Sequence, residues 1–378
     1  MTTALHNLLA EPNDARRIKE YVLLPIAILS KKESRTFTAA KALQFVESGD
    51  WTHFTLDAFA RRSAPVVDED THEKIKTKIA RDYLRLGGIA KAYAVSIRAP
   101  PTNRFEPGAL LNFFISIHPR RDYHIAAMSE REQNRATPLH YRQVLAAIRR
   151  AKPLKAPGIG SLRFDHLKYM TAGEDYDQPS HFLTLFADMI NLIACAKVPP
   201  LLASFLYQTK GLGIPKSNGG IRPIGMRDVH VNLTLNILMK ENSEEIMEAF
   251  KDCNFALNGP KGIDKAILHC NLWRELHPAH DSVFVDGTAA YQRVRRDASL
   301  MCSKEHIPGI APLLHSLHEN PSRIWIKEEQ GVPVGVSTEE GTTQGCGGGT
   351  IQYACGAKQQ PDSRKQRHTL LDIQMMGT

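Results

Sequence analysis

The stretch GLGIPKSNGGIRPI, residues 211–224, is the clearest structural signal in this sequence. Two extended runs flank Ser217–Gly220, and an Asn-Gly pair between extended runs is the strongest short-range signal for a β-hairpin. Pro215 and Pro223 have no amide hydrogen to donate, so both strands are expected at exposed edges of a sheet. The sequence therefore predicts a β-hairpin at this point.

Further strands are expected downstream of the hairpin. Ser282–Val285 is a short apolar run of the kind found in buried strands, and it delivers Asp286 at its end. A second hairpin is expected from Arg323–Ile326 through Val332 to Val336.

Helical patterns account for most of the rest of the sequence. Residues 1–117 are mostly helical in pattern, and Phe182–Lys197 has apolar residues at i, i+3, i+4 and i+7 after Ser180, a good N-cap. A further helix is expected over Val231–Phe250. Strands and helices together predict an α+β fold.

Composition limits the class of protein. The chain has 378 residues, enough for two or three domains, and a formal net charge of +8. Its six cysteines show no close CxxC pair, a pattern typical of reduced intracellular thiols. The longest early apolar run, Tyr21–Leu29, is far shorter than the ~20 residues of a membrane span. These features predict an intracellular protein with no membrane partner.

Positive charge is concentrated in residues 118–155, which contain nine basic and three acidic residues. Such a stripe can neutralise several phosphates of a nucleic acid. The alternative is a solvated helix face whose arginine stems cover apolar surface. The six candidate nucleic-acid contacts are Arg120, Arg121, Arg149, Arg150, Lys152 and Lys155.

Asp286 is the candidate metal ligand. A carboxylate at the end of a buried strand is costly unless it is hydrogen-bonded, paired or bound to a cation. Tyr291 follows five residues later with small residues between, where an aromatic ring can exclude a ribose 2′-hydroxyl. The alternative is that Asp286 caps the next helix while Tyr291 packs in the core.

Two further features suit a nucleotide. Lys216 and Arg222 lie on neighbouring strands of the hairpin, where a point charge and a bidentate fork can grip a triphosphate. The polar, glycine-punctuated run Ser337–Gly345 can approach a base or sugar closely. It can equally be a surface loop, which the glycines at 347–349 favour.

The order of these pieces is more specific than any one of them. Four segments carry the pattern, in this chain order: Ala156–Gly160 with Leu162–Leu167, the hairpin with Lys216 and Arg222, Asp286–Tyr291, and Glu340–Gly345. Residues 150–356 resemble a reverse transcriptase, an RNA-directed DNA polymerase, of the non-LTR retrotransposon type.

The resemblance implies a fold of the right-hand polymerase type, with fingers and an incomplete palm after a mostly helical N-terminal region. The implied division is 1–117 for the helical region, 118–155 for a basic linker or helix, 156–356 for fingers and partial palm, and 357–378 for a divergent basic tail.

The resemblance also implies roles for individual residues. Lys216 and Arg222 would contact the phosphates of an incoming deoxynucleoside triphosphate, and Tyr291 would be the steric gate against ribonucleotides. Gln344 and Gly345 would line the nucleotide and template pocket.

Magnesium is the implied cofactor. Asp286 would be the first metal-binding aspartate, with the Gly287 carbonyl as a second ligand. The family's two magnesium ions activate the primer 3′-hydroxyl and stabilise the leaving pyrophosphate. The implied partners are an RNA template and a DNA primer, and a functional retroelement product would act in the nucleus.

The sequence departs from the family in its last part. No Asp-Asp pair follows residue 286, and after Gly356 the only aspartates are Asp362 and Asp372. The family's thumb is also missing, and three glycines at 347–349 replace bulkier residues. We therefore expect a truncated copy that does not polymerise DNA by itself.

Two other functions remain open from the residues alone. The first is a non-catalytic nucleic-acid-binding protein that uses the basic stripe and the hairpin. The second is a metal-dependent hydrolase built on His277, His280 and Asp281. Pro278 disfavours the second, because it suggests a turn where a metal-bearing helix is needed.

Overall fold

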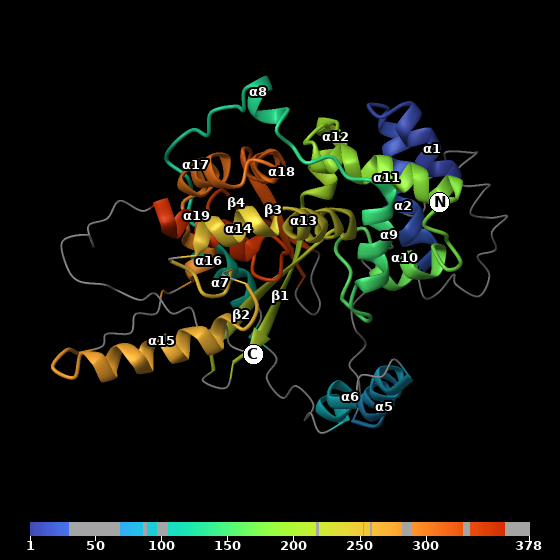
Figure 1. Cartoon of the computed structure of the whole chain (residues 1–378). Helices are drawn as coiled ribbons and strands as arrows, with labels where there is room; N and C mark the ends of the chain where they lie inside the picture. Colours follow the sequence, from blue (N-terminus) through green and yellow to red (C-terminus); the bar gives the residue numbers. More distant parts are fainter. Residues whose placement is uncertain are drawn as a thin grey trace.

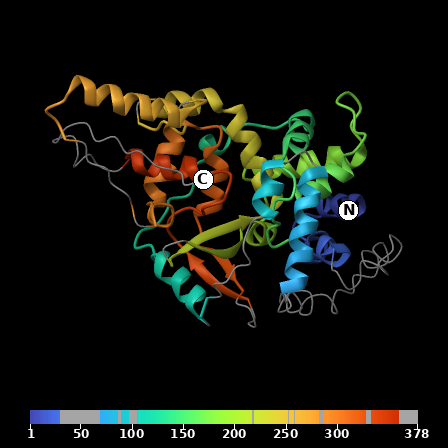
Figure 2. The ribbon, with the colours of Figure 1, turned by 90° about the horizontal axis from the view of Figure 1, so that it is seen from below.

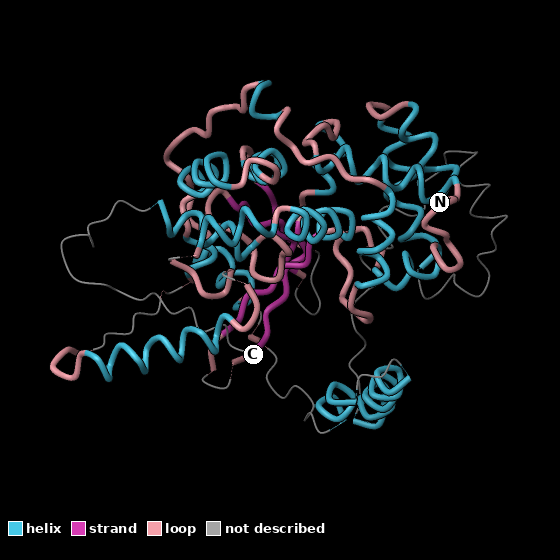
Figure 3. The backbone as a smooth tube through the Cα atoms, in the orientation of Figure 1, coloured by secondary structure: helices cyan, strands magenta, loops and turns pink. Residues whose placement is uncertain are grey.

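The computed structural model describes residues 1–29, 69–85, 89–96, 105–106, 108–216, 219–251, 253–257, 259–281, 287, 289–327 and 333–359. The fold is α+β, as the sequence predicts: helices surround one small mixed sheet whose strand order is β2-β1-β3-β4 (Figures 1 and 3). The predicted strand Ser282–Val285 lies outside the described residues.

The sheet consists of two antiparallel hairpins, and one strand of each hairpin pairs in parallel with a strand of the other. β1 (Thr209–Pro215) pairs with β2 (Ile221–Arg227), and β3 (Ser322–Ile326) pairs with β4 (Val334–Thr338). β1 and β3 run parallel and pair over Thr209–Gly211. Both predicted hairpins are therefore confirmed.

The prediction that both strands of the first hairpin are edge strands is half wrong. β2 is an edge strand and accommodates Pro223, but β1 is paired on both sides at its start. Pro215 is tolerated because the pairing of β1 with β3 ends at Gly211, four residues earlier. A proline excludes pairing only at its own position, not along a whole strand.

Helices fill the described N-terminal part, as predicted. They are α1 (Thr2–Ala10), α2 (Ala15–Leu29), α5 (Glu69–Arg85), α6 (Ile89–Ser96) and α7 (Ala109–Ile117). α1 packs on α2 and on the later helix α11 (His181–Ala194), α5 packs on α6, and α7 covers one face of the sheet through β2 and β4 (Figure 2).

The middle of the chain is also helical. Its helices are α8 (Glu130–Gln133), α9 (Tyr141–Arg150), α10 (Phe164–Met170), α11 (His181–Ala194) and α12 (Pro200–Leu206). The predicted helix after Ser180 is confirmed as α11, and the Ser180 hydroxyl accepts from the Leu183 amide at 3.2 Å.

The single helix predicted over Val231–Phe250 is wrong. The structure has α13 (Val229–Glu241) and α14 (Ser243–Phe250), with a break at Asn242. The Asn242 side chain donates to the Leu238 carbonyl at 2.8 Å and accepts from the Thr137 hydroxyl at 3.2 Å. A side chain that bonds backbone and a distant residue in this way ends a helix that apolar spacing alone would continue.

The described C-terminal part adds five helices. They are α15 (Gly262–Leu276), α16 (Ala290–Arg293), α17 (Arg296–His306), α18 (Ala311–His318) and α19 (Gly349–Gln359). α17 packs on α18 and α19. In both ribbon views α15 projects from the body of the molecule (Figures 1 and 2).

Buried apolar side chains form two clusters. The larger one, here called the helical cluster, draws on α1, α2, α9, α11, α13, α17, α18 and α19. The smaller one, the sheet cluster, joins α7 to β3 and β4 through Leu110, Phe114, Ile324, Ile326 and Val336. Among the described helices, none is both long and apolar enough to cross a bilayer.

Candidate functional site

Lys216 and Arg222 lie on the same face of the β1–β2 hairpin. Arg222 is opposite Ile214, and Lys216 follows Ile214 by two residues, so alternation places all three side chains on one face. The Lys216 amide donates to the Gly220 carbonyl at 2.8 Å and closes the turn. Lys216 is exposed and Arg222 half-buried, and neither has an ion-pair partner in the part of the chain that the structure describes.

The opposite face of β1 is turned toward α7. A Cβ added at Gly211 would lie 3.3 Å from the Phe114 ring, and one at Gly213 would lie 2.4 Å from the Leu110 side chain. The two cations therefore face away from α7, on the side of the hairpin that the sheet cluster does not use.

The Gln344–Gly345 loop is bonded to the end of the same hairpin. The Gln344 carbonyl accepts from the Gly225 amide at 2.8 Å. A Cβ at Gly225 would lie 1.8 Å from the Thr343 methyl carbon, so only glycine allows this approach. Gly345 adopts a φ of +98°, in the left-handed region that favours glycine.

The loop is bonded at its other end to the turn that carries Tyr291. The Thr342 amide donates to the Tyr291 carbonyl at 2.7 Å, and the Gly341 amide donates to the Val294 carbonyl at 2.9 Å. Gly341 has a φ of +71°, and a Cβ there would lie 2.2 Å from the Gln292 carbonyl oxygen. One loop thus joins two segments that the sequence singled out separately.

Tyr291 is held by α19. Its ring stacks on Tyr353 with centroids 5.1 Å apart and planes 22° apart, and its hydroxyl lies 3.4 Å from the Thr350 hydroxyl. The side chain is half-buried. The ring is therefore held in place by its neighbours but remains partly exposed. The alternative role as a core residue would require it to be fully buried.

The Ala156–Gly160 segment also meets the hairpin. A Cβ at Gly158 would lie 2.6 Å from the Arg227 carbonyl oxygen, and one at Gly160 would lie 2.7 Å from the Asp228 carboxylate. These two glycines allow the loop to lie against the end of β2. Two segments that are distant in the sequence, Ala156–Gly160 and Gln344–Gly345, thus converge on the end of the hairpin where β2 finishes, and the second of them carries the Tyr291 turn through Thr342.

Sequence reasoning missed a buried arginine, Arg296, at the centre of this junction. Its Nε donates to the Gly341 carbonyl at 2.9 Å, and its amide donates to the Glu340 carboxylate at 2.9 Å. Burial and, second to it, the positive charge of Arg227 lower the pKa of Arg296 to about 9. The side chain remains charged near neutral pH and fixes the start of the loop.

Tyr123 is a second missed residue. Its hydroxyl accepts from the Arg296 amide at 3.0 Å, and the Arg295 guanidinium lies 4.5 Å from the centre of its ring. Burial raises the pKa of Tyr123, and the hydrogen bond to Glu340 raises it further. The only signal in the sequence was its place in the basic stripe, which draws attention to charges rather than to an aromatic ring.

The predicted metal ligands are only partly described. Asp286 lies outside the described residues, whereas Gly287 is described. In the described ranges, no group of three His, Cys, Asp or Glu side chains is arranged to hold a metal ion. His277 and His280 lie with ring centroids 5.6 Å apart, and His277 Nδ1 is engaged by the Trp273 carbonyl at 3.0 Å.

Three of the six candidate basic residues are engaged by the fold itself. Arg121 donates to the Glu319 carbonyl at 3.1 Å, Arg149 donates to the Glu174 carbonyl at 2.5 Å, and the Lys155 ammonium lies 5.5 Å from the centre of the Phe164 ring. The alternative interpretation of the stripe was a solvated helix face. It does not apply to most of the six residues, because only Arg149 and Arg150 lie in a helix.

The other three basic residues are available to a ligand. Arg120, Arg150 and Lys152 are exposed, and within the described ranges none of them has an ion-pair partner. Arg150 ends α9 and Lys152 follows it closely, so this pair is the more compact positive surface.

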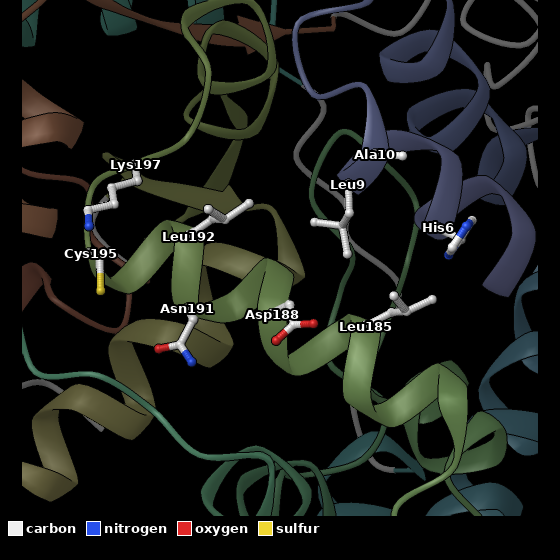
Figure 4. Close-up of a pocket in the computed structure, with 9 residues that line it drawn as sticks. All are labelled: His6, Leu9, Ala10, Leu185, Asp188, Asn191, Leu192, Cys195 and Lys197. Carbon is white, nitrogen blue, oxygen red and sulfur yellow. The ribbon is translucent and has the colours of Figure 1, made fainter.

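A surface groove lies apart from the hairpin. It has a volume of about 530 Å³ and runs between α1 and α11, with Leu9 and His6 on one side and Asp188, Asn191 and Cys195 on the other (Figure 4). The Asn191 amide is already bonded to the backbone of Leu139. None of the predicted site residues lines this groove.

No protein-family model matches this chain, and a search of curated proteins finds no match.

Proposed function

We propose that this chain is a reverse-transcriptase-like protein of retrotransposon origin that binds a nucleic-acid template and a nucleotide. The β1–β2 hairpin would act as the fingers over the nucleotide, with Lys216 and Arg222 on its phosphates. Gln344 and Gly345 would line the pocket, and Tyr291 would stand against the ribose.

A single observation carries this proposal. The Gln344–Gly345 loop bonds to the hairpin at Gly225 and to the turn of Tyr291 through Thr342. The resemblance assigns the three segments to one nucleotide pocket, although they are far apart in the sequence. Their direct bonding supports the assignment, because a chance similarity of short motifs would not require the motifs to meet.

The donor set does not fit a two-ion magnesium centre. Two ions need several carboxylates, and the resemblance assigns only Asp286 among the residues of this chain. We therefore derive no metal-dependent step, and we expect the chain by itself to bind template and nucleotide without extending a primer.

The test is primer extension on an RNA template with magnesium, for the natural chain beside Asp286→Asn. We expect no extension by either. Extension by the natural chain that Asp286→Asn abolishes would contradict the expected inactivity and would support the enzymatic assignment.

Binding tests the remainder of the proposal. We expect Lys216→Gln with Arg222→Gln to weaken binding of a fluorescent deoxynucleoside triphosphate at least tenfold, because two charge-assisted contacts are lost. Lys240→Gln, which removes an exposed lysine of α13, is the matched control. Equal affinity in both variants would overturn the role of the hairpin.

A second candidate function is nucleic-acid binding without a nucleotide pocket. It is favoured by Arg120, Arg150 and Lys152, which are exposed and have no ion-pair partner among the described residues. In that case Arg150→Gln with Lys152→Gln would weaken RNA binding and reduce its salt dependence, while nucleotide binding would be undetectable in all variants.

A further inference from the structure

Helix α5 carries a row of basic side chains. Lys74, Lys78, Arg81 and Arg85 follow one another at intervals of four, three and four residues. At 3.6 residues per turn, this spacing keeps all four on one side of the helix. Each of them is exposed. These four residues, here called the α5 row, extend over about 17 Å of the helix axis at a rise of about 1.5 Å per residue.

The opposite side of α5 is covered by the fold. α5 packs on α6, and the two helices lie side by side in both ribbon views (Figures 1 and 2). Lys76, Ala80 and Tyr83 are half-buried, and each comes two residues after a member of the row, about half a turn around the helix. The α5 row therefore faces away from the covered side.

The described acidic side chains of α5 leave the middle of the row without a counter-charge. Glu73 forms its ion pair with Lys76, off the row, at 3.0 Å. Asp82 lies 3.9 Å from Arg85, at the far end of the row, and both side chains of this pair are partly exposed. In the described parts of the chain, Lys78 and Arg81 have no ion-pair partner.

This arrangement differs from an ordinary solvated helix face. Basic and acidic residues three or four apart stabilise a helix, as Lys76 and Glu73 do, whereas like charges at the same spacing destabilise it. Each step along the α5 row brings two positive charges together at this spacing. A ligand that places several negative charges along the row would relieve the repulsion.

We propose that the α5 row binds the phosphate backbone of a nucleic-acid strand. Neighbouring members of the row are separated by a rise of about 4.5 or 6 Å, so each long side chain can take one phosphate of an extended strand. Phosphate contacts position a strand without reading its bases, so binding at the row is independent of nucleotide sequence.

An anionic membrane is a poorer fit to the same charges. A helix that lies on a bilayer inserts its apolar face into the lipid, and the face of α5 opposite the row is packed on α6. The inference does not rest on the proposed reverse-transcriptase function, because the α5 row includes none of the residues assigned to the nucleotide pocket.

A salt titration of RNA binding tests the row. Fluorescence anisotropy of a labelled uridine homopolymer is measured with the full chain over a range of sodium chloride concentrations. The row variant carries Lys74→Gln, Lys78→Gln, Arg81→Gln and Arg85→Gln. It is expected to bind at least about tenfold more weakly, and its plot of log affinity against log salt is expected to be shallower by about 3, since each lost phosphate contact of a single strand removes about 0.7.

A matched variant separates the row from net charge. It loses four exposed cations of other elements through Lys19→Gln, Lys197→Gln, Lys240→Gln and Arg274→Gln. We expect its affinity and salt slope to stay close to those of the natural chain. Equal losses in the two variants, or an unchanged slope in the row variant, would overturn the proposal.

A charge-conserving variant shows that folding is not the cause. Exchanging lysine and arginine at all four positions of the row keeps the charges, and it is expected to preserve the salt slope. Loss of RNA binding in this variant would indicate a structural role for the row and would overturn the proposal.

Two further probes separate this inference from its alternatives. If the row variant loses binding to phosphatidylserine vesicles but still binds RNA as the natural chain does, the row is a membrane contact and the proposal is wrong. The row variant is expected to bind a fluorescent deoxynucleoside triphosphate as the natural chain does. A natural chain that binds RNA through the row but binds no nucleotide would overturn the proposed function alone.

Discussion

The helical cluster and the sheet cluster exclude water in different ways. The helical cluster is a large continuous set of interlocking side chains, and Phe186 and Met189 of α11 are among its fully buried members. The sheet cluster has five buried residues and a single covering helix, α7. Packing of large side chains stabilises the helical cluster. The sheet cluster depends on the close approach of other residues to the backbone of the sheet.

Glycines make that backbone approach possible. At Gly211, an added Cβ would lie 2.2 Å from the Ile326 side chain, and at Gly225 it would lie 1.8 Å from Thr343. The hairpin of the candidate site belongs to this second, thinner region, whereas Tyr291 is held by α19 of the helical cluster. The cations of the site therefore stand on the part of the fold that buries less apolar surface, and we expect this part to open before the helical cluster does.

The largest loss of stability is expected when one fully buried phenylalanine is removed from each cluster. Phe186→Ala and Phe114→Ala are each expected to cost about 3–5 kcal/mol of unfolding free energy, because both side chains are only 1% exposed. The two variants should differ in which amides lose protection from hydrogen exchange. Phe186→Ala should lower the protection of amides throughout the chain. Phe114→Ala should lower it mainly in α7 and the sheet.

Hydrogen exchange followed by mass spectrometry measures this difference. If Phe114→Ala exposes the amides of α11 and α13 as strongly as those of β1–β4, the two clusters form one cooperative unit and the comparison fails.

The next test targets the close approach at the site. Gly225→Ala is expected to cost about 1–3 kcal/mol, because the new methyl group displaces Thr343 and with it the Gln344 carbonyl. Thr343→Ser removes the opposing methyl carbon and should recover part of that loss. A double-mutant cycle by urea unfolding checks this, and additive costs would show that the two residues are not in contact.

The elements that were predicted correctly are those whose formation depends on residues close in the sequence. The pairing of β1 with β2 and the helix after Ser180 depend on neighbouring residues, and both form as expected. The break at Asn242 was missed because its cause includes Thr137, which is distant in the sequence. Periodicity of apolar residues carries no information about such a partner.

The site was predictable in its parts but not in its assembly. The residue types of Lys216 and Gln344 suggest phosphate and base contacts, yet only the fold shows that Gly225 bonds to Gln344. Arg296 was missed because an arginine in a charged run normally indicates surface. Its burial follows from acceptors on a segment that comes later in the chain, Glu340 and Gly341.

A smaller effect is expected from a buried hydrogen-bonded chain that ties α2 to α13. The Tyr21 hydroxyl lies 2.6 Å from His230 Nε2, and His230 Nδ1 lies 2.6 Å from the Asp228 carboxylate. Tyr21→Phe keeps the ring but leaves His230 Nε2 unpaired, at a cost of roughly 1 kcal/mol. Chemical denaturation measures it, with Tyr169→Phe, which alters an 84% exposed ring, as control.

The smallest expected effect is a pH dependence that arises at Glu132. The pKa of Glu132 is lowered to about 2 because the Ser129 amide and hydroxyl donate to its carboxylate, each at 2.8 Å, with Lys304 of α17 adding at 3.2 Å. A lowered pKa in the folded state stabilises the fold above the unfolded pKa, and that contribution is lost as pH falls through the folded pKa.

Glu132→Gln should therefore lower stability near neutral pH and make it less sensitive to acid between about pH 4.5 and 2. Glu130→Gln is the matched control, because it removes an exposed carboxylate of the same short helix. Urea unfolding across this range is the measurement. Since Lys304 lies on a helix that contributes Leu300 and Cys302 to the helical cluster, the acid-dependent loss should appear there and leave exchange in the sheet unchanged. An equal loss in both regions would show that the clusters unfold together.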